Sequence, residues 1–170
     1  GQKWLVRPRT SGLLVFTDGG TIDETGDDQY KVLTTFENQG KLPTMDVFSI
    51  TEDLDGEVWV GTGKGIAVFY NPEAIFSDEN FDCQQILIEQ DGNVQILLET
   101  EVVSAITVDG GNRKWLGTQS SGVFLVSPDG TTELQHFTAD NSPLPSNNVT
   151  SISISGTTGE VFISTDQGIV

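Results

Sequence analysis

Short apolar stretches separated by polar, glycine-containing turns recur along the whole chain. Four segments share one order: an aromatic residue in an apolar stretch, a short polar loop, and a glycine that leads into a second apolar stretch. They begin at Lys3, Glu57, Lys114 and Glu160. Apolar runs of this length, bounded by turn residues, favour strands, and no amphipathic helix of useful length is present. The pattern therefore predicts an all-β repeat protein.

The second unit shows the expected strand order most clearly. Its first three strands are predicted at Val47–Glu52, Glu57–Gly61 and Gly65–Tyr70, and the fourth strand is clearest in the third unit, at Thr132–Thr138. Asp-Gly pairs at positions 18, 55, 91, 109 and 129 mark hairpins. Glycine accepts positive φ there, and Asp can hydrogen-bond the amides of its own turn.

An insertion in the second unit interrupts the strand pattern. One helical turn is expected at Asn71–Phe76, with Asn71 as the N-cap and Pro72 as the first helical residue. We expect the turn to lie between the third and fourth strands of that unit.

A repeat of about 45 to 55 residues made only of short strands is typical of β-propeller blades. The blade units are expected at residues 1–41, 42–97, 98–143 and 144–170 of a single domain. The chain starts at the second strand of one unit and stops at the third strand of another. It is therefore expected to be a partial β-propeller of about three to four four-stranded antiparallel blades, incomplete at both ends. Open sheet edges of this kind invite self-association.

The spacing of the repeated residues resembles the two-component regulator propeller repeat. In this repeat Leu-Pro precedes an Asp-containing turn, a Trp, a Gly-Thr pair and a final glycine. The pattern is nearly complete at Leu42–Gly65 and stands with small changes at Val103–Gly122. It is weaker at Leu144–Gly168, where Phe162 replaces the Trp and Ser164 replaces the glycine of Gly-Thr.

A narrower resemblance is to the PorZ-like propeller proteins of type IX (Por) secretion. It rests on Gly19–Asp23, Asp27–Lys31, Ala67–Glu73, Ile88–Gly92 and Thr158–Ile169. This resemblance implies a non-enzymatic binding or scaffold segment of a bacterial cell-envelope protein, in the periplasm or at the outer membrane or cell surface, with a protein or glycan partner. The wider family implies an alternative, the periplasmic region of a hybrid two-component regulator that senses a glycan.

The composition limits the partners and the chemistry. With 25 acidic and 8 basic residues the net charge is −17, which argues against nucleic acid, because binding there needs cations to neutralise phosphates. No apolar run approaches the ~20 residues that span a bilayer, so no direct membrane insertion is expected. His136 and Cys83 are the single histidine and the single cysteine. We expect His136 at an exposed rim and Cys83 without activation, and we assign no catalytic residue and no enzymatic activity.

Scarce cations form the first candidate site. Arg7, Arg9 and Lys64 all fall in loops between the second and third strands of their units. In a propeller these loops share a face with the links between blades, near the central channel. Such a cluster can bind an anionic glycan or a carboxylate. Ordinary loop charge is the alternative interpretation.

Carboxylates form the second candidate site. Residues 18–28 contain five of them, and Asp23, Asp27 and Asp28 are candidate Ca²⁺ ligands, since Ca²⁺ takes oxygen donors. The spacing departs from the EF-hand loop, and a solvated acidic hairpin is the simpler interpretation; no other cofactor is expected. Asp53 and Asp109 lie in turns that follow the first strand of their units, where capping of the turn explains them better than a metal does.

Aromatic residues hold one position in all four units, at Trp4, Trp59, Trp115 and Phe162. An aromatic platform for sugars is one interpretation of them. A residue that recurs at one strand position in every unit is more simply explained by packing between blades, where replacing a Trp by Ala costs about 3–5 kcal/mol. We therefore expect these four side chains to be structural.

Overall fold

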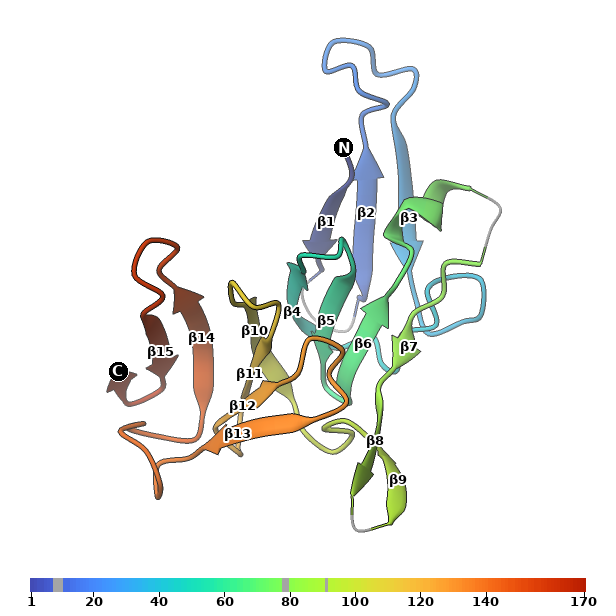
Figure 1. Cartoon of the computed structure of the whole chain (residues 1–170). Coiled ribbons are helices and arrows are strands. Elements are labelled where there is room, and N and C mark those ends of the chain that lie inside the picture. Colours follow the sequence, from blue (N-terminus) through green and yellow to red (C-terminus); the bar gives the residue numbers. More distant parts are fainter. Residues whose placement is uncertain (8–10, 78–79, 91) are drawn as a thin grey trace.

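The computed structural model describes residues 1–7, 11–77, 80–90 and 92–170. Within these ranges the chain forms short antiparallel strands joined by tight turns, with a single 3₁₀ helix, so the all-β prediction is confirmed. The strands make two three-stranded sheets, two four-stranded sheets and a separate hairpin (Figure 1). No helix in the described residues is long and apolar enough to cross a membrane.

Each sheet is a meander in which consecutive strands pair in chain order. Sheet 1 contains β1 (Lys3–Val6), β2 (Leu13–Thr17) and β3 (Gln29–Leu33). Sheet 2 contains β4 (Val47–Glu52), β5 (Val58–Thr62), β6 (Gly65–Phe69) and β7 (Gln84–Gln85). Sheet 3 contains β10 (Val103–Val108), β11 (Lys114–Thr118), β12 (Val123–Val126) and β13 (Glu133–Phe137). Sheet 4 contains β14 (Val149–Ile154), β15 (Val161–Thr165) and β16 (Gly168–Ile169).

The predicted strands lie within one residue of the observed ones at nearly every end. β4 has the predicted bounds, and β5 and β6 are each displaced by one residue at one or both ends. The Asp-Gly pairs at 18, 55, 109 and 129 lie in links between paired strands. Gly92 lies in the link between β8 (Leu87–Gln90) and β9 (Asn93–Ile96), which form a separate hairpin. The local turn chemistry therefore specifies the hairpins.

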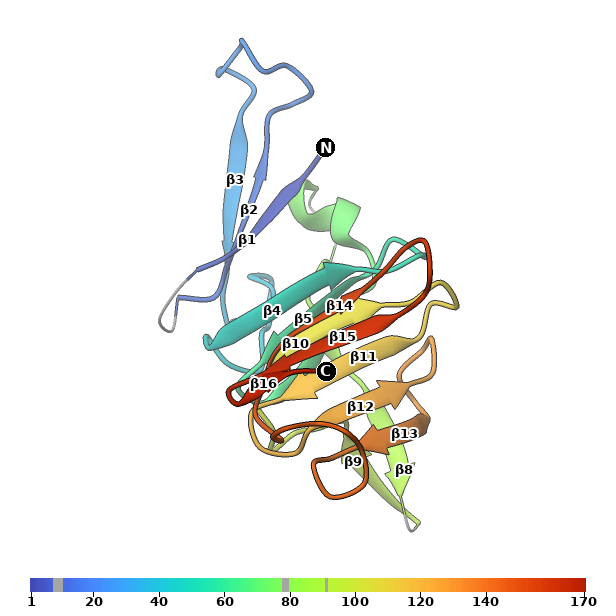
Figure 2. The same cartoon turned by 90° about the vertical axis from the view of Figure 1, so that its left-hand side faces the viewer.

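The first strands of sheets 2, 3 and 4 lie side by side, as Figures 1 and 2 both show for β4, β10 and β14. The glycine of the repeated Gly-Thr pair, Gly61 in β5 and Gly117 in β11, allows this close approach. A Cβ at Gly61 would lie 2.5 Å from the carbonyl oxygen of Val103, and a Cβ at Gly117 would lie 2.5 Å from a methyl carbon of Val149. Any larger residue would force neighbouring sheets apart.

The core consists of three apolar clusters, each between two successive sheets. Side chains alternate between the faces of a strand, and β5 shows the result. Val58 and Val60 pack toward sheet 1, whereas Trp59 packs toward sheet 3 among Leu116 and Val126. Sheets 2 and 3 are thus covered on both faces, which explains why their inner strands are apolar at nearly every position.

The insertion after β6 holds the 3₁₀ helix η1 (Pro72–Phe76), where a helical turn was predicted, but the side chain of Asn71 does not cap it. The Ala74 N–H instead donates to the backbone oxygen of Asn71 at 3.1 Å. The donor that a side-chain cap would bind is therefore already satisfied. The chain continues through β7 into the hairpin of β8 and β9. This hairpin is additional to the four strands predicted for each unit.

Candidate functional site

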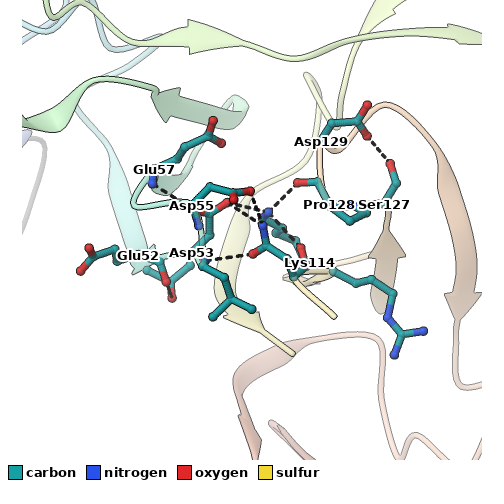
Figure 3. Close-up of polar contacts among 12 residues, drawn as sticks. Glu52, Asp53, Asp55, Glu57, Lys114, Ser127, Pro128 and Asp129 are labelled. Atoms are coloured by element: carbon teal, nitrogen blue, oxygen red, sulfur yellow. Dashed lines mark hydrogen bonds and ion pairs between the residues drawn. The ribbon is translucent and has the colours of Figure 1, made fainter. Parts of the chain in front are cut away.

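The most enclosed polar cluster joins the β4–β5 turn to sheet 3 (Figure 3). Lys114 and Asp53 both have fully buried side chains, with Lys114 Nζ 2.7 Å from Asp53 Oδ2. The ammonium also donates to the backbone oxygens of Asn112 at 3.0 Å and Pro128 at 2.5 Å, and lies 4.4 Å from the ring centroid of Trp59. Three hydrogen bonds satisfy the three ammonium donors, as the burial of a charge requires.

Asn112 extends this contact between the sheets. Its Nδ2 donates to Asp55 Oδ2 at 2.7 Å and to Asp53 Oδ2 at 3.5 Å, and its Oδ1 accepts the Leu54 N–H at 3.0 Å. The side chains of Asn112 and Lys114 therefore fill the space between the β4–β5 and β10–β11 turns.

Asp53 also caps its own turn, as predicted. Its Oδ1 accepts the N–H groups of Asp55 and Glu57, both at 2.9 Å. Burial alone would raise the pKa of Asp53, but the hydrogen bonds from Lys114 and from these amides outweigh burial, so the pKa lies below its usual value. Asp53 is therefore ionised at neutral pH and balances the charge of Lys114.

Asp109 repeats the turn cap in sheet 3 with a different charge partner. Its Oδ1 accepts the N–H groups of Gly111 at 2.9 Å and Arg113 at 3.0 Å. Its Oδ2 accepts from Arg113 Nε at 2.7 Å and from Trp115 Nε1 at 3.4 Å. Burial opposes ionisation, yet these hydrogen bonds lower the pKa of Asp109 overall. The cation that faces Asp109 thus comes from its own turn and not from the next sheet.

Further ionisable groups surround the buried pair (Figure 3). Burial, followed by the charge of Asp53, raises the pKa of Glu57. Burial, followed by the charges of Glu57 and Asp129, raises the pKa of Tyr70. A hydrogen bond from Ser127 is the largest of the effects that lower the pKa of Asp129. The region around the buried pair therefore contains more carboxyl groups than the ammonium of Lys114 can neutralise.

This cluster is suited to holding two sheets together. Lys114 has no exposed surface and Asp53 is paired with it, so neither group is free to act as a base or nucleophile. In the described ranges, no three His, Cys, Asp or Glu side chains gather where they could hold a metal ion. The sequence pattern did not single out Lys114. The available signal was that Val58 and Val161 hold the equivalent position in two other units, although the first unit has the exposed Lys3 there.

The loops that carry the candidate cations lie beside the links between units, as predicted. The Gly12 N–H donates to the Met45 oxygen and the Gly65 N–H to the Glu101 oxygen, both at 3.0 Å. Gly65 has φ +75°, and a Cβ there would lie 2.5 Å from the oxygen of Leu97. Glycine is therefore required where this loop touches the next link.

The candidate cations themselves belong to different sheets. Arg7 follows β1 and donates through Nη1 to the Ser11 oxygen at 3.2 Å. Lys64 is exposed in the β5–β6 turn. Arg9 lies outside the described residues. The structure thus places Arg7 and Lys64 at the same edge of neighbouring sheets without joining them in one contact.

The carboxylates proposed as calcium ligands do not converge. Asp23 and Asp28 are exposed, and Asp27 accepts the Thr21 hydroxyl at 2.8 Å through Oδ2. Asp27 Oδ1 is buried without a hydrogen-bond partner among the described residues. Asp18 in the same hairpin pairs with Lys3 at 2.7 Å. These contacts hold the hairpin without assembling a group of metal ligands.

The repeated aromatic residues differ in burial. Trp59 is fully buried, and Trp4 and Trp115 are half-buried. Trp115 stacks parallel to Phe137 with 5.7 Å between ring centroids. Phe162, expected between blades, is instead 49 % exposed. Each of the Trp residues packs toward the sheet that follows it, and among the described residues no sheet follows sheet 4, which agrees with the greater exposure of the Phe162 ring.

His136 and Cys83 are both engaged by the fold. His136 lies on β13, the outer strand of sheet 3, with Nε2 2.6 Å from the Ser121 oxygen and its ring stacked on Phe124 at 3.9 Å. Burial raises the pKa of the Cys83 thiol to about 12, so the thiolate is absent at neutral pH. This agrees with the prediction that Cys83 is not activated.

This architecture is found in propeller-like domains of bacterial surface and extracellular sensor proteins. PorZ, a surface component of the type IX secretion system of Porphyromonas gingivalis, aligns with 99 % of this chain at 29 % identity and a TM-score of 0.84. The extracellular domain of a putative hybrid two-component system from B. thetaiotaomicron aligns with 94 % of the chain at 25 % identity and a TM-score of 0.63. Both resemblances seen in the sequence are therefore confirmed.

Sequence comparison gives a consistent result. A histidine kinase of Formosa agariphila is 30 % identical over 101 residues, which are 59 % of this chain and 7 % of the kinase. No family model matches the chain. The chain spans 24 % of PorZ and 18 % of the two-component domain. A putative gluconolactonase with a TM-score of 0.55 is only 13 % identical and shares the fold alone.

Proposed function

We propose that sheets 1 to 4 are consecutive blades of a β-propeller, corresponding to residues 1–41, 42–97, 98–143 and 144–170. Three observations support this arrangement. The sheets are antiparallel meanders, their first strands lie side by side in sheets 2 to 4, and a single aromatic position packs toward the next sheet in the first three units. A complete structure of the full-length protein tests the number of blades.

We propose further that these blades are a non-enzymatic binding or scaffold segment of a bacterial cell-envelope protein linked to type IX secretion. The observation that carries this proposal is the alignment with PorZ over 99 % of the chain at a TM-score of 0.84. The protein would act in the periplasm or at the cell surface, where a protein or glycan is its partner.

A second candidate function is ligand sensing in a hybrid two-component regulator. The similarity to a two-component extracellular domain and to a histidine kinase favours it. In that case a bound glycan would shift the signalling state of the whole receptor, and the propeller would supply part of the sensing region.

A role without catalysis is supported by the state of the reactive groups. The Cys83 thiol has a pKa of about 12, and the Nε2 atom of the His136 ring lies 2.6 Å from the Ser121 oxygen. The buried Lys114 and Asp53 neutralise one another. The histidine, the cysteine and this lysine–aspartate pair are therefore committed to the fold.

Two experiments separate the candidates. The coding sequence beyond Val170 should encode a β-sandwich module if the secretion proposal holds, and a transmembrane helix followed by a histidine kinase if the sensor proposal holds. Deleting the gene should abolish release of type IX cargo into the medium, measured by mass spectrometry of the culture supernatant. Normal cargo release from the deletion strain would overturn the secretion proposal.

The binding residues proposed for either role are Arg7 and Lys64, together with Arg9. Replacing Arg7 and Arg9 by Ala should weaken binding of an acidic polysaccharide such as polygalacturonate. Stability should change by no more than about 0.5 kcal/mol, since these are loop positions. Lys3→Ala, which removes an exposed lysine at the opposite end of β1 from Arg7, is the control. Unchanged binding in the double variant would remove these residues from the site.

A further inference from the structure

A pocket of about 420 Å³ lies between the β10–β11 turn and the β14–β15 turn. Its size falls within the range of small-molecule sites. Its walls combine one charge pair, one indole ring and several peptide groups, contributed by Asp109, Gly110, Arg113, Trp115, Ser155 and Gly156. It lies at the opposite edge of the sheets from the loops of Arg7 and Lys64, so it is separate from the site proposed above.

The pocket exists because sheet 4 lacks the two polar side chains that fill the equivalent space between sheets 2 and 3. Between sheets 2 and 3, Asn112 and Lys114 cross the gap and bind the facing turn. Gly159 and Val161 occupy the corresponding positions in sheet 4 and line the pocket. Neither residue can reach across with a polar group, so the space that is filled at one interface is open at the next.

The charges of the two turns that face these spaces also differ. The β4–β5 turn presents Asp55 and Glu57, whereas the equivalent positions of the β10–β11 turn hold Gly111 and Arg113. The Arg113 side chain is 48 % exposed and binds Asp109 through Nε at 2.7 Å. Within the described part of the chain its guanidinium donates no other hydrogen bond, so the terminal nitrogens remain available.

Peptide donors lie around the same space. The N–H groups of Gly110 and Gly156, both lining residues, donate no hydrogen bond to any residue that the structure describes. A Cβ at either glycine would meet no atom within 4 Å, so both walls are open. Where the first interface presents acceptors to a lysine, the second presents these donors, and the Asp109 carboxylate that also lines it already accepts from Gly111, Arg113 and Trp115. A ligand that complements it must supply acceptor oxygens.

We propose that this pocket binds a small carboxylate-bearing ligand whose ring or apolar body lies along Trp115. The terminal nitrogens of Arg113 bind the carboxylate as a planar pair, a geometry in which a guanidinium surpasses an ammonium. Asp109 orients the guanidinium through Nε. Stacking on Phe137 holds the indole in place as an apolar wall.

Titration of the full-length protein with benzoate tests the proposal, and benzamide serves as the uncharged probe of the same shape. Benzoate should bind at least about threefold more tightly than benzamide, because the exposed guanidinium of Arg113 binds a carboxylate more strongly than a neutral amide. Arg113→Gln should remove this preference. Lys41→Gln is the matched control, since Lys41 also forms an exposed ion pair with the residue four positions away, Glu37; it should leave benzoate affinity within about twofold.

A second variant separates loss of the ligand site from loss of the fold. Gly156→Leu should fill the pocket and abolish benzoate binding while leaving Arg113 and the melting temperature unchanged. Equal affinity of the unaltered protein for benzoate and benzamide, absence of benzoate binding, a preference for benzoate that survives Arg113→Gln, or benzoate binding that survives Gly156→Leu would each overturn the proposal. Calorimetry measures the affinities, and circular dichroism confirms that the variants are folded.

Discussion

The interface between sheets 2 and 3 and the interface between sheets 3 and 4 share one backbone design but differ in their polar chemistry. At both, a first strand packs on the next first strand, and an Asp caps a turn above a Trp. The first interface is closed by the buried pair of Lys114 and Asp53. The second leaves a pocket of about 420 Å³ where that contact would stand.

This difference shows how a repeat can preserve its fold while changing what lies between its units. Apolar packing and the glycine before the threonine maintain the spacing of the sheets. The turn residues are not needed for that spacing, so they are free to vary. In one place they hold two sheets together, and in the next they leave a cavity with a distinct set of donors.

Removing the buried cation should give the largest effect. Lys114→Ala leaves the Asp53 carboxylate buried without its partner, which should lower the free energy of unfolding by about 3–5 kcal/mol. Urea unfolding of the protein measures the loss. Arg113→Ala removes the cation from the exposed pair at the other interface and should cost less than about 1 kcal/mol. Equal losses would show that the two interfaces are energetically alike.

Replacing the glycine of the repeated Gly-Thr pair should give the next largest loss of stability. Gly61→Ala places a methyl group 2.5 Å from the backbone oxygen of Val103, which cannot move without moving β10. We expect a loss of about 1–3 kcal/mol. Gly117→Ala meets a side-chain methyl group of Val149, which can turn away, so its cost should be smaller. Thermal unfolding of both variants tests the order, and a larger loss at Gly117 would contradict it.

The turn cap at the second interface should matter less. Asp109→Ala removes the acceptor for the amides of Gly111 and Arg113. Water can reach this turn, so the expected loss is about 0.5–1.5 kcal/mol. A shift in the midpoint of thermal unfolding measures it. Asp109→Asn retains one acceptor oxygen and should recover part of the loss.

The change of stability with pH should be the smallest of these effects near neutral pH. The pKa values of Asp53 and Asp109 are lowered in the folded protein, so their stabilisation is fully present above the usual Asp pKa of about 3.9. It should be lost as the pH falls from there through the lowered pKa values. The melting temperature, followed from pH 7 to pH 2, should therefore change little until about pH 4 and then fall. A decline centred near pH 6 would contradict this account.

The strands and turns could be predicted from the sequence because their causes are local. The bounds of β4 and the cap of Asp53 follow from apolar runs and Asp-Gly turns. Contacts between sheets depend on residues far apart in the chain. Lys114 and Asp53 are 61 positions apart, and no local pattern links them, so their ion pair could not be anticipated.

Two side chains show how the surroundings decide a contact. Phe162 was expected to pack between blades because an aromatic residue recurs at its position in every unit; its ring is 49 % exposed, since burial at this position depends on the sheet that follows. Asn71 has the side chain of an N-cap, but the tighter 3₁₀ turn already uses the donor. Residue type and position in the repeat predicted the element correctly in each case, while the surroundings decided the contact.

The forward packing of each aromatic side chain has a consequence during protein synthesis. Trp59 is covered by residues of sheet 3, such as Val126, which leave the ribosome after most of the third unit has been made. At roughly 5–20 residues per second, sheet 2 would present a bare indole for some seconds on the nascent chain. Each unit would therefore wait for its successor before it is complete, and a ribosomal pause within the third unit would prolong the period in which a chaperone can bind.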